Sequence, residues 1–322
     1  MQLRLRPSLA CLALALPAMV AHAQEFPSKA VRIIVPLGTA STSDSVTRIL
    51  APKLSEMWGQ PVVVENQPGA NGMIAAANVA KSPPDGHTLT TISPNYVINP
   101  SIYSKVPYDT LRDIKPIARM ALSEMILVVH PSVPVNNLNE FIQLAKSKPG
   151  QLNYGSGGGG SATHLATAMF GSMSGTNIVH VPYKSVGTAL TDLLGGKLEF
   201  SFVTASFGVA QVRAGKVRAL GIASPERLAQ LPGVPTVSEA GVPGYDVVAW
   251  VGLAGPQGMS PALVNRVASD TIRALASKDV VDRLEGLGVK VATMPAAEFQ
   301  SYVISEHAKW GEAVKQSGAK VE

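Results

Sequence analysis

Two glycine- and hydroxyl-rich stretches carry the residue types best suited to bind an anion. One covers residues 154–164, with five glycines, and the other covers residues 38–44, with the sequence Gly-Thr-Ala-Ser-Thr-Ser-Asp. Each follows an expected strand and precedes an expected helix. Glycine lets the backbone approach a ligand closely, and the first turn of a helix presents free N–H groups at its positive end. Two flexible turns are the alternative, but both stretches occur at the same step of a β–α unit, which favours a carboxylate site.

Nucleotide binding fits these residues less well. Gly155, Gly157 and Gly160 match the spacing of a dinucleotide-binding loop, which a run of glycines satisfies easily. Such a site also uses an acid at the end of the next strand, where this sequence has Pro-Tyr-Lys at 182–184. The sequence has no Gly-Lys-Ser or Gly-Lys-Thr, so a P-loop is excluded.

Catalysis by a serine or a metal also lacks the usual signals. Ser156, His164 and Asp192 could be drawn as a hydrolase triad, but the sequence has no Gly-x-Ser-x-Gly nucleophile elbow. The histidines are scattered without metal-ligand spacing. We therefore expect no catalytic residue, no metal and no cofactor.

The elements that must position these loops alternate along the chain. Short apolar runs typical of strands are followed by segments with apolar residues at helical spacing. We expect strands at 31–35, 61–65, 88–92, 125–129, 178–181, 198–203, 217–222 and 247–253. We expect helices at 73–80, 138–146, 162–173 and 188–194, and others that begin near Ser43 or Asp44, at Pro261 and near Phe299. This alternation predicts an α/β fold.

The composition is that of a globular chain long enough for two substantial cores. Of its 322 residues, 46% are hydrophobic and 15% are charged. The net charge is +5, and it becomes +3 (25 basic minus 22 acidic) without the two arginines of the expected leader. Such a small excess does not indicate nucleic-acid binding.

Residues 1–23 have the pattern of a secretory signal. Arg4 and Arg6 precede an apolar stretch at 9–20 and a small-x-small cleavage site that ends at Ala23. The apolar stretch is well short of the roughly 20 residues that span a bilayer. We expect export to the periplasm, cleavage near Ala23, a mature chain without the single cysteine Cys11, and no direct membrane insertion.

Several motifs in order along the chain point to one known family. They include Gly-Gln-Pro-Val-Val-Val-Glu-Asn at 59–66, Pro-Asp-Gly-His-Thr-Leu at 84–89 and His-Val-Pro-Tyr-Lys at 180–184. With these, nearly the whole mature chain resembles the periplasmic receptors of tripartite tricarboxylate transporters, also called Bug-type receptors. The other matching segments are 31–44, 68–70, 99–100, 154–165, 193–196, 231–241 and 250–252.

The resemblance implies a type II periplasmic-binding-protein fold, in which two α/β lobes joined by two crossing strands enclose a ligand cleft. Lobe one would comprise residues 24–124 and 246–322, and lobe two residues 125–245. The crossings would lie near 122–128 and 245–251.

The resemblance also implies which residues hold the ligand. The loop after the first strand and the glycine loop would clamp a carboxylate through backbone N–H groups, hydroxyls and bridging waters. The residues implied as ligand contacts are Thr39, Ala40, Ser41, Thr42, Asp44, Asn95, Ser156, Gly157, Gly160, Ser161, Thr163, His164, Tyr183, Lys184 and Thr204.

The implied function is capture of a small organic carboxylate by a monomer that delivers it to membrane permease subunits. Ala40 and Ser41 stand where family members usually have two glycines, and Val203 and Thr204 stand where an amine-recognising acid is common. The missing acid favours an uncharged-chain or aromatic carboxylate over an amino acid. Two alternatives stay open: an exported serine hydrolase acting through Ser156, and a receptor that feeds a sensor kinase.

Overall fold

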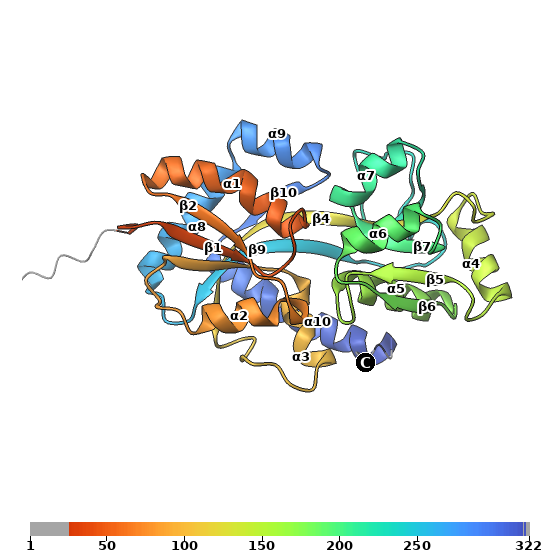
Figure 1. Ribbon diagram of the computed structural model, residues 1–322, viewed down its shortest axis with the longest axis horizontal. Helices are drawn as coiled ribbons and strands as arrows, with labels where there is room; N and C mark the ends of the chain where they lie inside the picture. Colours follow the sequence, from red (N-terminus) through yellow and green to blue (C-terminus); the bar gives the residue numbers. More distant parts are fainter. Residues whose placement is uncertain (1–25, 318, 320–322) are drawn as a thin grey trace, which may run out of the picture.

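The structure is a computed structural model that describes residues 26–317 and 319, and it alternates strands and helices as the sequence predicts (Figure 1). The expected signal at 1–23 lies outside these residues. The elements are, in order, β1 (Val31–Val35), α1 (Thr42–Trp58), β2 (Val62–Asn66), η1 (Ala70–Gly72), α2 (Met73–Ala80), β3 (Thr88–Ile92), α3 (Pro94–Ile102), β4 (Ile114–Val129), α4 (Leu138–Ser147), β5 (Asn153–Ser156), α5 (Ala162–Ser174), β6 (Val179–Pro182), α6 (Val186–Leu194), β7 (Phe200–Thr204), α7 (Ala205–Arg213), β8 (Arg218–Ile222), β9 (Val248–Pro256), α8 (Pro261–Leu275), α9 (Lys278–Gly286), β10 (Lys290–Met294) and α10 (Ala296–Ser317).

The strands form one hydrogen-bonded path that changes partners within β4. The path runs β2-β1-β3-β9-β4-β7-β5-β6, and β8 and β10 also pair with β4. Residues 114–124 of β4 pair with β9 and part of this stretch with β10, whereas residues 125–129 pair with β7 and β8. We call β1–β3, β9, β10 and helices α1–α3 and α8–α10 the first half, and β5–β8 with α4–α7 the second half. Figure 1 shows the two halves side by side, with β4 and β9 running between them.

The first βα unit shows how local sequence shapes the site. β1 is buried except at Arg32, as expected for a strand in a parallel sheet covered on both faces. The loop that follows ends at Ser41, whose extended backbone and hydroxyl cap α1. The helix therefore begins slightly earlier than the expected start near Ser43 or Asp44, and neither residue is its N-cap, because both already lie in the first helical turn. The helix also continues through Pro52 to a left-handed Gly59.

Other differences from the expected elements follow from pairing between distant segments. β4 begins at Ile114, eleven residues before the expected strand, because partners on both sides supply its hydrogen bonds. Helices α3, α7 and α9 and strand β10 were not expected. No helix among residues 26–317 is both long and apolar enough to cross a bilayer.

The centre of β9 is held against α10 by a buried polar contact. Trp250 and Trp310 are both fully buried, and each indole N–H donates to Oε2 of Glu306, at 2.8 and 2.9 Å. A buried carboxylate needs such donors to offset its lost hydration. Helix α10 packs on α3 and β4 of the sheet and also on α5 of the second half, so it braces the region where the halves meet.

Candidate functional site

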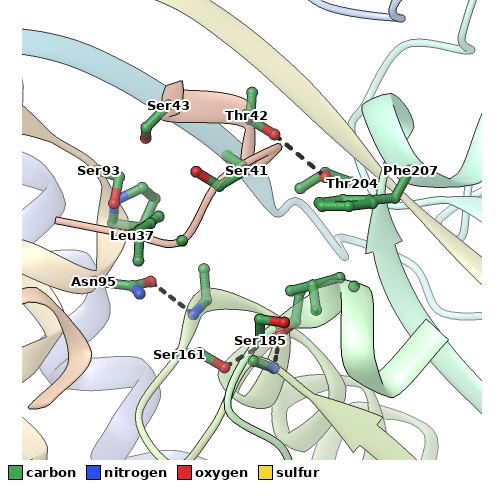
Figure 2. A pocket seen from close by; sticks show the side chains of 18 of the residues that line it. Leu37, Ser41, Thr42, Ser43, Ser93, Asn95, Ser161, Ser185, Thr204 and Phe207 are labelled. Carbon is green, nitrogen blue, oxygen red and sulfur yellow. Dashed lines mark hydrogen bonds between the residues drawn. The ribbon is translucent and has the colours of Figure 1, made fainter. Parts of the chain in front are cut away.

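The two halves face each other across a cavity of about 250 Å³ (Figure 2). This volume lies just below the usual range of pockets for drug-sized ligands, about 300–1,000 Å³, and suits a smaller solute. The walls come from both halves and from Met125 of β4. The lining residues are Leu37, Gly38, Thr39, Ala40, Ser41, Thr42, Ser43, Ser93, Pro94, Asn95, Met125, Gly157, Ser161, Ala162, Thr163, Lys184, Ser185, Val186, Gly187, Thr204, Phe207, Ala249, Trp250 and Val251.

Five helix N-termini converge on this cavity. The N-cap residues of α1, α3, α5, α6 and α7 all line it, and all five carry a hydroxyl: Ser41, Ser93, Ser161, Ser185 and Thr204. A helix N-terminus leaves backbone N–H groups without intrahelical partners and carries roughly half a positive charge. The cavity therefore favours a negative oxygen without needing a cationic side chain.

The caps leave the outermost amides of the helices for other acceptors. The hydroxyl of Ser161 accepts from His164 N at 3.2 Å, and that of Ser185 accepts from Thr188 N at 3.2 Å. Each cap thus satisfies the amide at the third helical position. The first two residues of α5 and α6 line the cavity, and the first amide of α5, Ala162 N, donates to Oδ1 of Asn95 at 3.0 Å. Thr204 does not cap in this way, because its hydroxyl lies 3.3 Å from that of Thr42 across the gap (Figure 2).

Formal charge on the cavity wall is sparse. Lys184 is the one charged side chain among the lining residues, and it is exposed. Within the part of the chain that the structure describes, no aspartate, glutamate or histidine lines the wall. The cavity therefore offers no anionic partner for a ligand ammonium group.

Part of the wall is apolar. Phe207 lies on α7, beside the gap between the halves in Figure 2, and Val186 and Gly187 line the cavity nearby from α6. Leu37 and Val251 add apolar surface from the first half. The arrangement combines donors for an anionic group with contacts for a hydrocarbon body.

Ten of the fifteen residues expected to contact the ligand line this cavity: Thr39, Ala40, Ser41, Thr42, Asn95, Gly157, Ser161, Thr163, Lys184 and Thr204. That they bind a ligand stays a prediction. Sequence reasoning missed Ser93, Ser185 and Phe207. Ser93-Pro94 and Ser185 with Thr188 have the composition of helix starts, which was the available signal.

Asp44 lies behind the wall, where it supports the first loop. Its carboxylate is buried and accepts from Ala40 N at 2.9 Å and from Asn66 Nδ2 at 2.8 Å. It also pairs with Arg48 Nε at 2.9 Å. Ala40 has a left-handed φ of 63°, a costly conformation for alanine, which the Asp44 contact helps to hold. Direct contact between Asp44 and a ligand is not supported, because Asp44 does not line the cavity and its carboxylate is engaged by these three partners.

Ser156 and His164 also lie behind the wall. The Ser156 hydroxyl is 2.7 Å from Nε2 of His180, and Nδ1 of His164 accepts from Gly160 N at 3.1 Å. The two imidazoles stack with centroids 4.0 Å apart. Burial lowers the pKa of His164 to about 4, and burial together with the neighbouring His164 lowers the pKa of His180 to about 4. Both rings are therefore neutral at pH 7, and they support the glycine loop.

The triad drawn from the sequence is not assembled. His164 is engaged by Gly160, and Asp192 accepts from the Tyr183 hydroxyl at 2.9 Å and pairs with Lys197. Of the residues expected to contact the ligand, Gly160 and Tyr183 also do not line the cavity. Ser156 is 1% exposed, so the serine that does contact a histidine is closed to a substrate in this conformation. Within residues 26–317 no cluster of His, Cys, Asp and Glu could hold a metal ion.

Comparison with known proteins identifies the family of this chain. A family model described as "Tripartite tricarboxylate transporter family receptor" matches residues 46–319. A UPF0065 protein from the tcbD-tcbE intergenic region of Pseudomonas sp. (strain P51) is 35% identical over 309 residues, which cover 95% of this chain and 92% of that protein.

Two solved structures of similar proteins contain dicarboxylates. Rpa4515 of R. palustris with adipate has a TM-score of 0.88 and 31% identity, covering 92% of this chain and all of that one. MatC (Rpa3494) from Rhodopseudomonas palustris with bound malate has a TM-score of 0.83 and 31% identity, covering 90% of this chain and all of that one. These similarities confirm the predicted periplasmic-binding-protein fold. The chain belongs to the tripartite tricarboxylate transporter receptor family and is a solute-binding receptor of this type.

Proposed function

We propose that this protein captures a small organic carboxylate in the cavity between its halves and delivers it to a tripartite tricarboxylate-type permease. One observation carries the proposal: five helix N-termini, each with a serine or threonine at its N-cap position, meet at a cavity on whose wall residues 26–317 place no acidic side chain. Each terminus contributes about 0.3–1 kcal/mol to the binding of a nearby anion, and partly buried geometries contribute more. Several such termini acting together give useful affinity for one carboxylate.

Capture would follow from closure of two lobes. We assign residues 24–124 and 246–322 to lobe one and residues 125–245 to lobe two. The first boundary lies where β4 changes its partner from β9 to β7, between Glu124 and Met125, and the second lies just before β9 begins at Val248. The ligand would touch both lobes only when they are closed, so binding shifts the population toward the closed state. The paired segments of β4 and β9 are the proposed hinge.

The ligand is expected to have an uncharged or aromatic body and no amine. A ligand ammonium group would lie among helix N-termini with no carboxylate on the wall to offset its charge. Phe207, Val186 and Val251 would instead cover hydrocarbon. Similar receptors bind the carboxylates adipate and malate. The lining residues of this cavity are the reason for proposing a carboxylate without an amine for this protein.

The receptor is proposed to act in the periplasm as a monomer after removal of residues 1–23 near Ala23. Its partners would be the carboxylate and, transiently, the permease subunits, with no nucleic acid. The same cavity would equally serve a receptor that feeds a sensor kinase.

Binding without catalysis fits the cavity better than hydrolysis does. The contact between Ser156 and His180 is the observation that favours a hydrolase. However, Ser156 is buried away from the cavity, and Asp192 contacts Tyr183 and Lys197 instead of completing a triad. Ester turnover that is lost in Ser156→Ala would overturn the non-enzymatic proposal.

Calorimetric screening of the purified protein tests the proposal directly. The panel should pair each acid with its amino derivative, such as hexanoate with 6-aminohexanoate and phenylacetate with phenylglycine, and should include adipate and malate. We expect at least one amine-free carboxylate to bind, and its amino partner to bind more than tenfold more weakly. A panel without any binding carboxylate contradicts the proposal, and equal affinity for the amino partners contradicts its ligand class.

A further inference from the structure

Asparagine and tyrosine side chains of the first half form hydrogen bonds to the glycine loop of the second half (residues 157–161) and to the start of α5. The Asn71 side chain donates from Nδ2 to the carbonyl of Gly160 at 3.0 Å. The Tyr103 hydroxyl donates to the carbonyl of Gly159 at 2.9 Å. Oδ1 of Asn95 accepts from Ala162 N at 3.0 Å, as the dashed line at Asn95 shows in Figure 2. Three hydrogen bonds therefore cross from one half to the other within a few residues of the cavity.

The hydrogen bonds of this network are consistent with only one orientation of the Asn95 and Asn71 side-chain amides. Ala162 N can only donate, so the Asn95 oxygen must face it and the Asn95 amide nitrogen must face away. That nitrogen donates to Asn71 Oδ1 at 2.7 Å. The Asn71 nitrogen is thereby directed to Gly160 O and to Asn99 Oδ1, which is 2.7 Å away. Backbone groups at Ala162 and Gly160 thus determine how the side-chain amides of Asn95 and Asn71 are oriented.

The fit between the halves at this point is close. A Cβ atom added at Gly160 would lie 2.9 Å from Ile102 Cγ2 and 3.3 Å from the Tyr103 ring. Gly160 also has a φ of +75°, which disfavours any other residue. Asn71 itself has a left-handed φ of 53°, a conformation that asparagine tolerates better than most residues. Both halves therefore have left-handed backbone geometry where they meet, at Asn71 and at Gly160.

We propose that Asn71, together with Tyr103, forms a latch that holds the glycine loop against the first half and positions Asn95 in the ligand cavity. Asn71 does not line that cavity, whereas Asn95 does. The latch has two effects: it favours the closed arrangement of the halves, and it fixes the Asn95 oxygen on the first amide of α5. Asn71 is thus a positioning residue that acts through Asn95. Its effect on ligand affinity rests on the proposed function, whereas its effect on closure does not.

The test measures closure in the absence of any carboxylate. The mature chain has no cysteine, so Lys81→Cys and Gln143→Cys, both at exposed positions in opposite halves, allow two spin labels to be attached and their distance to be measured. The latch variants are Asn71→Gly, which keeps the left-handed backbone accessible, and Tyr103→Phe, which keeps the ring. Tyr96→Phe is the matched control, because it removes a tyrosine bond to a backbone carbonyl within the first half.

The latch predicts that Tyr103→Phe lowers the closed-to-open ratio about fivefold (about 1 kcal/mol) and that Asn71→Gly lowers it further, because it also frees Asn95. Tyr96→Phe should leave the ratio unchanged. In calorimetry with adipate as the probe, Asn71→Gly should bind at least fivefold more weakly than the control. Wild-type distances that are entirely long, or distances unchanged in both latch variants, overturn the proposal. Failure of wild type to bind adipate bears on the proposed function alone, and the distance measurement still decides the latch.

Discussion

The structure predicts that removal of the one cationic side chain on the cavity wall has only a small effect on carboxylate affinity. Lys184 is exposed and lines the cavity beside Ser185, the N-cap of α6. We expect Lys184→Gln to leave the protein folded and to weaken binding of the best carboxylate by about fivefold. The remaining affinity comes from neutral backbone donors, which this substitution leaves in place.

The magnitude follows from comparing exposed and partly buried charge. Two unit charges about 4 Å apart interact by about 1 kcal/mol in water, and flexible surface ion pairs usually contribute less than that. Five helix termini at about 0.3–1 kcal/mol each contribute roughly 1.5–5 kcal/mol together. The termini should therefore outweigh the lysine severalfold.

Isothermal titration calorimetry at two salt concentrations measures both quantities. Lys197→Gln serves as the matched control, because Lys197 is an exposed lysine in the same half that pairs with Asp192 away from the cavity wall. Affinity of Lys184→Gln should fall about fivefold at low salt and differ less from the control at high salt, since exposed charges are screened. A loss greater than 100-fold, or abolished binding, would refute the view that helix termini hold the anion.

Three further predictions concern the groups around the cavity. Asp44→Ala should lower the free energy of unfolding by about 2–3 kcal/mol in urea titrations, because the amide of Ala40 loses its buried acceptor; an unchanged midpoint would mean that the loop does not depend on it. The depressed pKa values of His164 and His180, both about 4, mean that the unfolded chain binds more protons than the folded one between pH 6.5 and 4. Stability should therefore fall as pH drops through that window, by up to roughly 3 kcal/mol per histidine, and His164→Gln should flatten the profile; a flat wild-type profile would contradict the assignment. Phe207→Ala should weaken an aromatic carboxylate about tenfold in calorimetry and malate much less, and an equal loss for both would remove Phe207 from the hydrocarbon wall.

Elements with strong local signals could be predicted from the sequence. β1 and β3 occupy the expected residues, because both are short segments rich in β-branched residues, and β1 ends at proline. α2 also begins and ends as expected. In contrast, the first eleven residues of β4 include Lys115 and Arg119 and have no strand-like pattern. Their conformation comes from pairing with β9 and β10, which are far away in the sequence.

The candidate site could be predicted only in part for a related reason. Glycines and hydroxyls indicate where a chain can expose amides, so the two loops at 38–44 and 154–164 were found. Ser93 and Ser185 also stand at helix N-cap positions, but sequence does not tell which helices point their N-termini at one cavity. Asp44 was, in contrast, predicted as a ligand contact although it does not line the cavity. Nothing local in the sequence indicates that its carboxylate accepts from Ala40 N instead of pointing toward the cavity.

The most direct test of the central claim compares the best-binding carboxylate of the panel with its carboxamide, which has nearly the same shape but no charge. Calorimetry on the wild-type protein at constant ionic strength gives both affinities. Because convergent helix N-termini stabilise a negative oxygen, the carboxylate should bind at least 100-fold more tightly than the amide. Comparable affinities would contradict the account, since the cavity would then recognise shape alone.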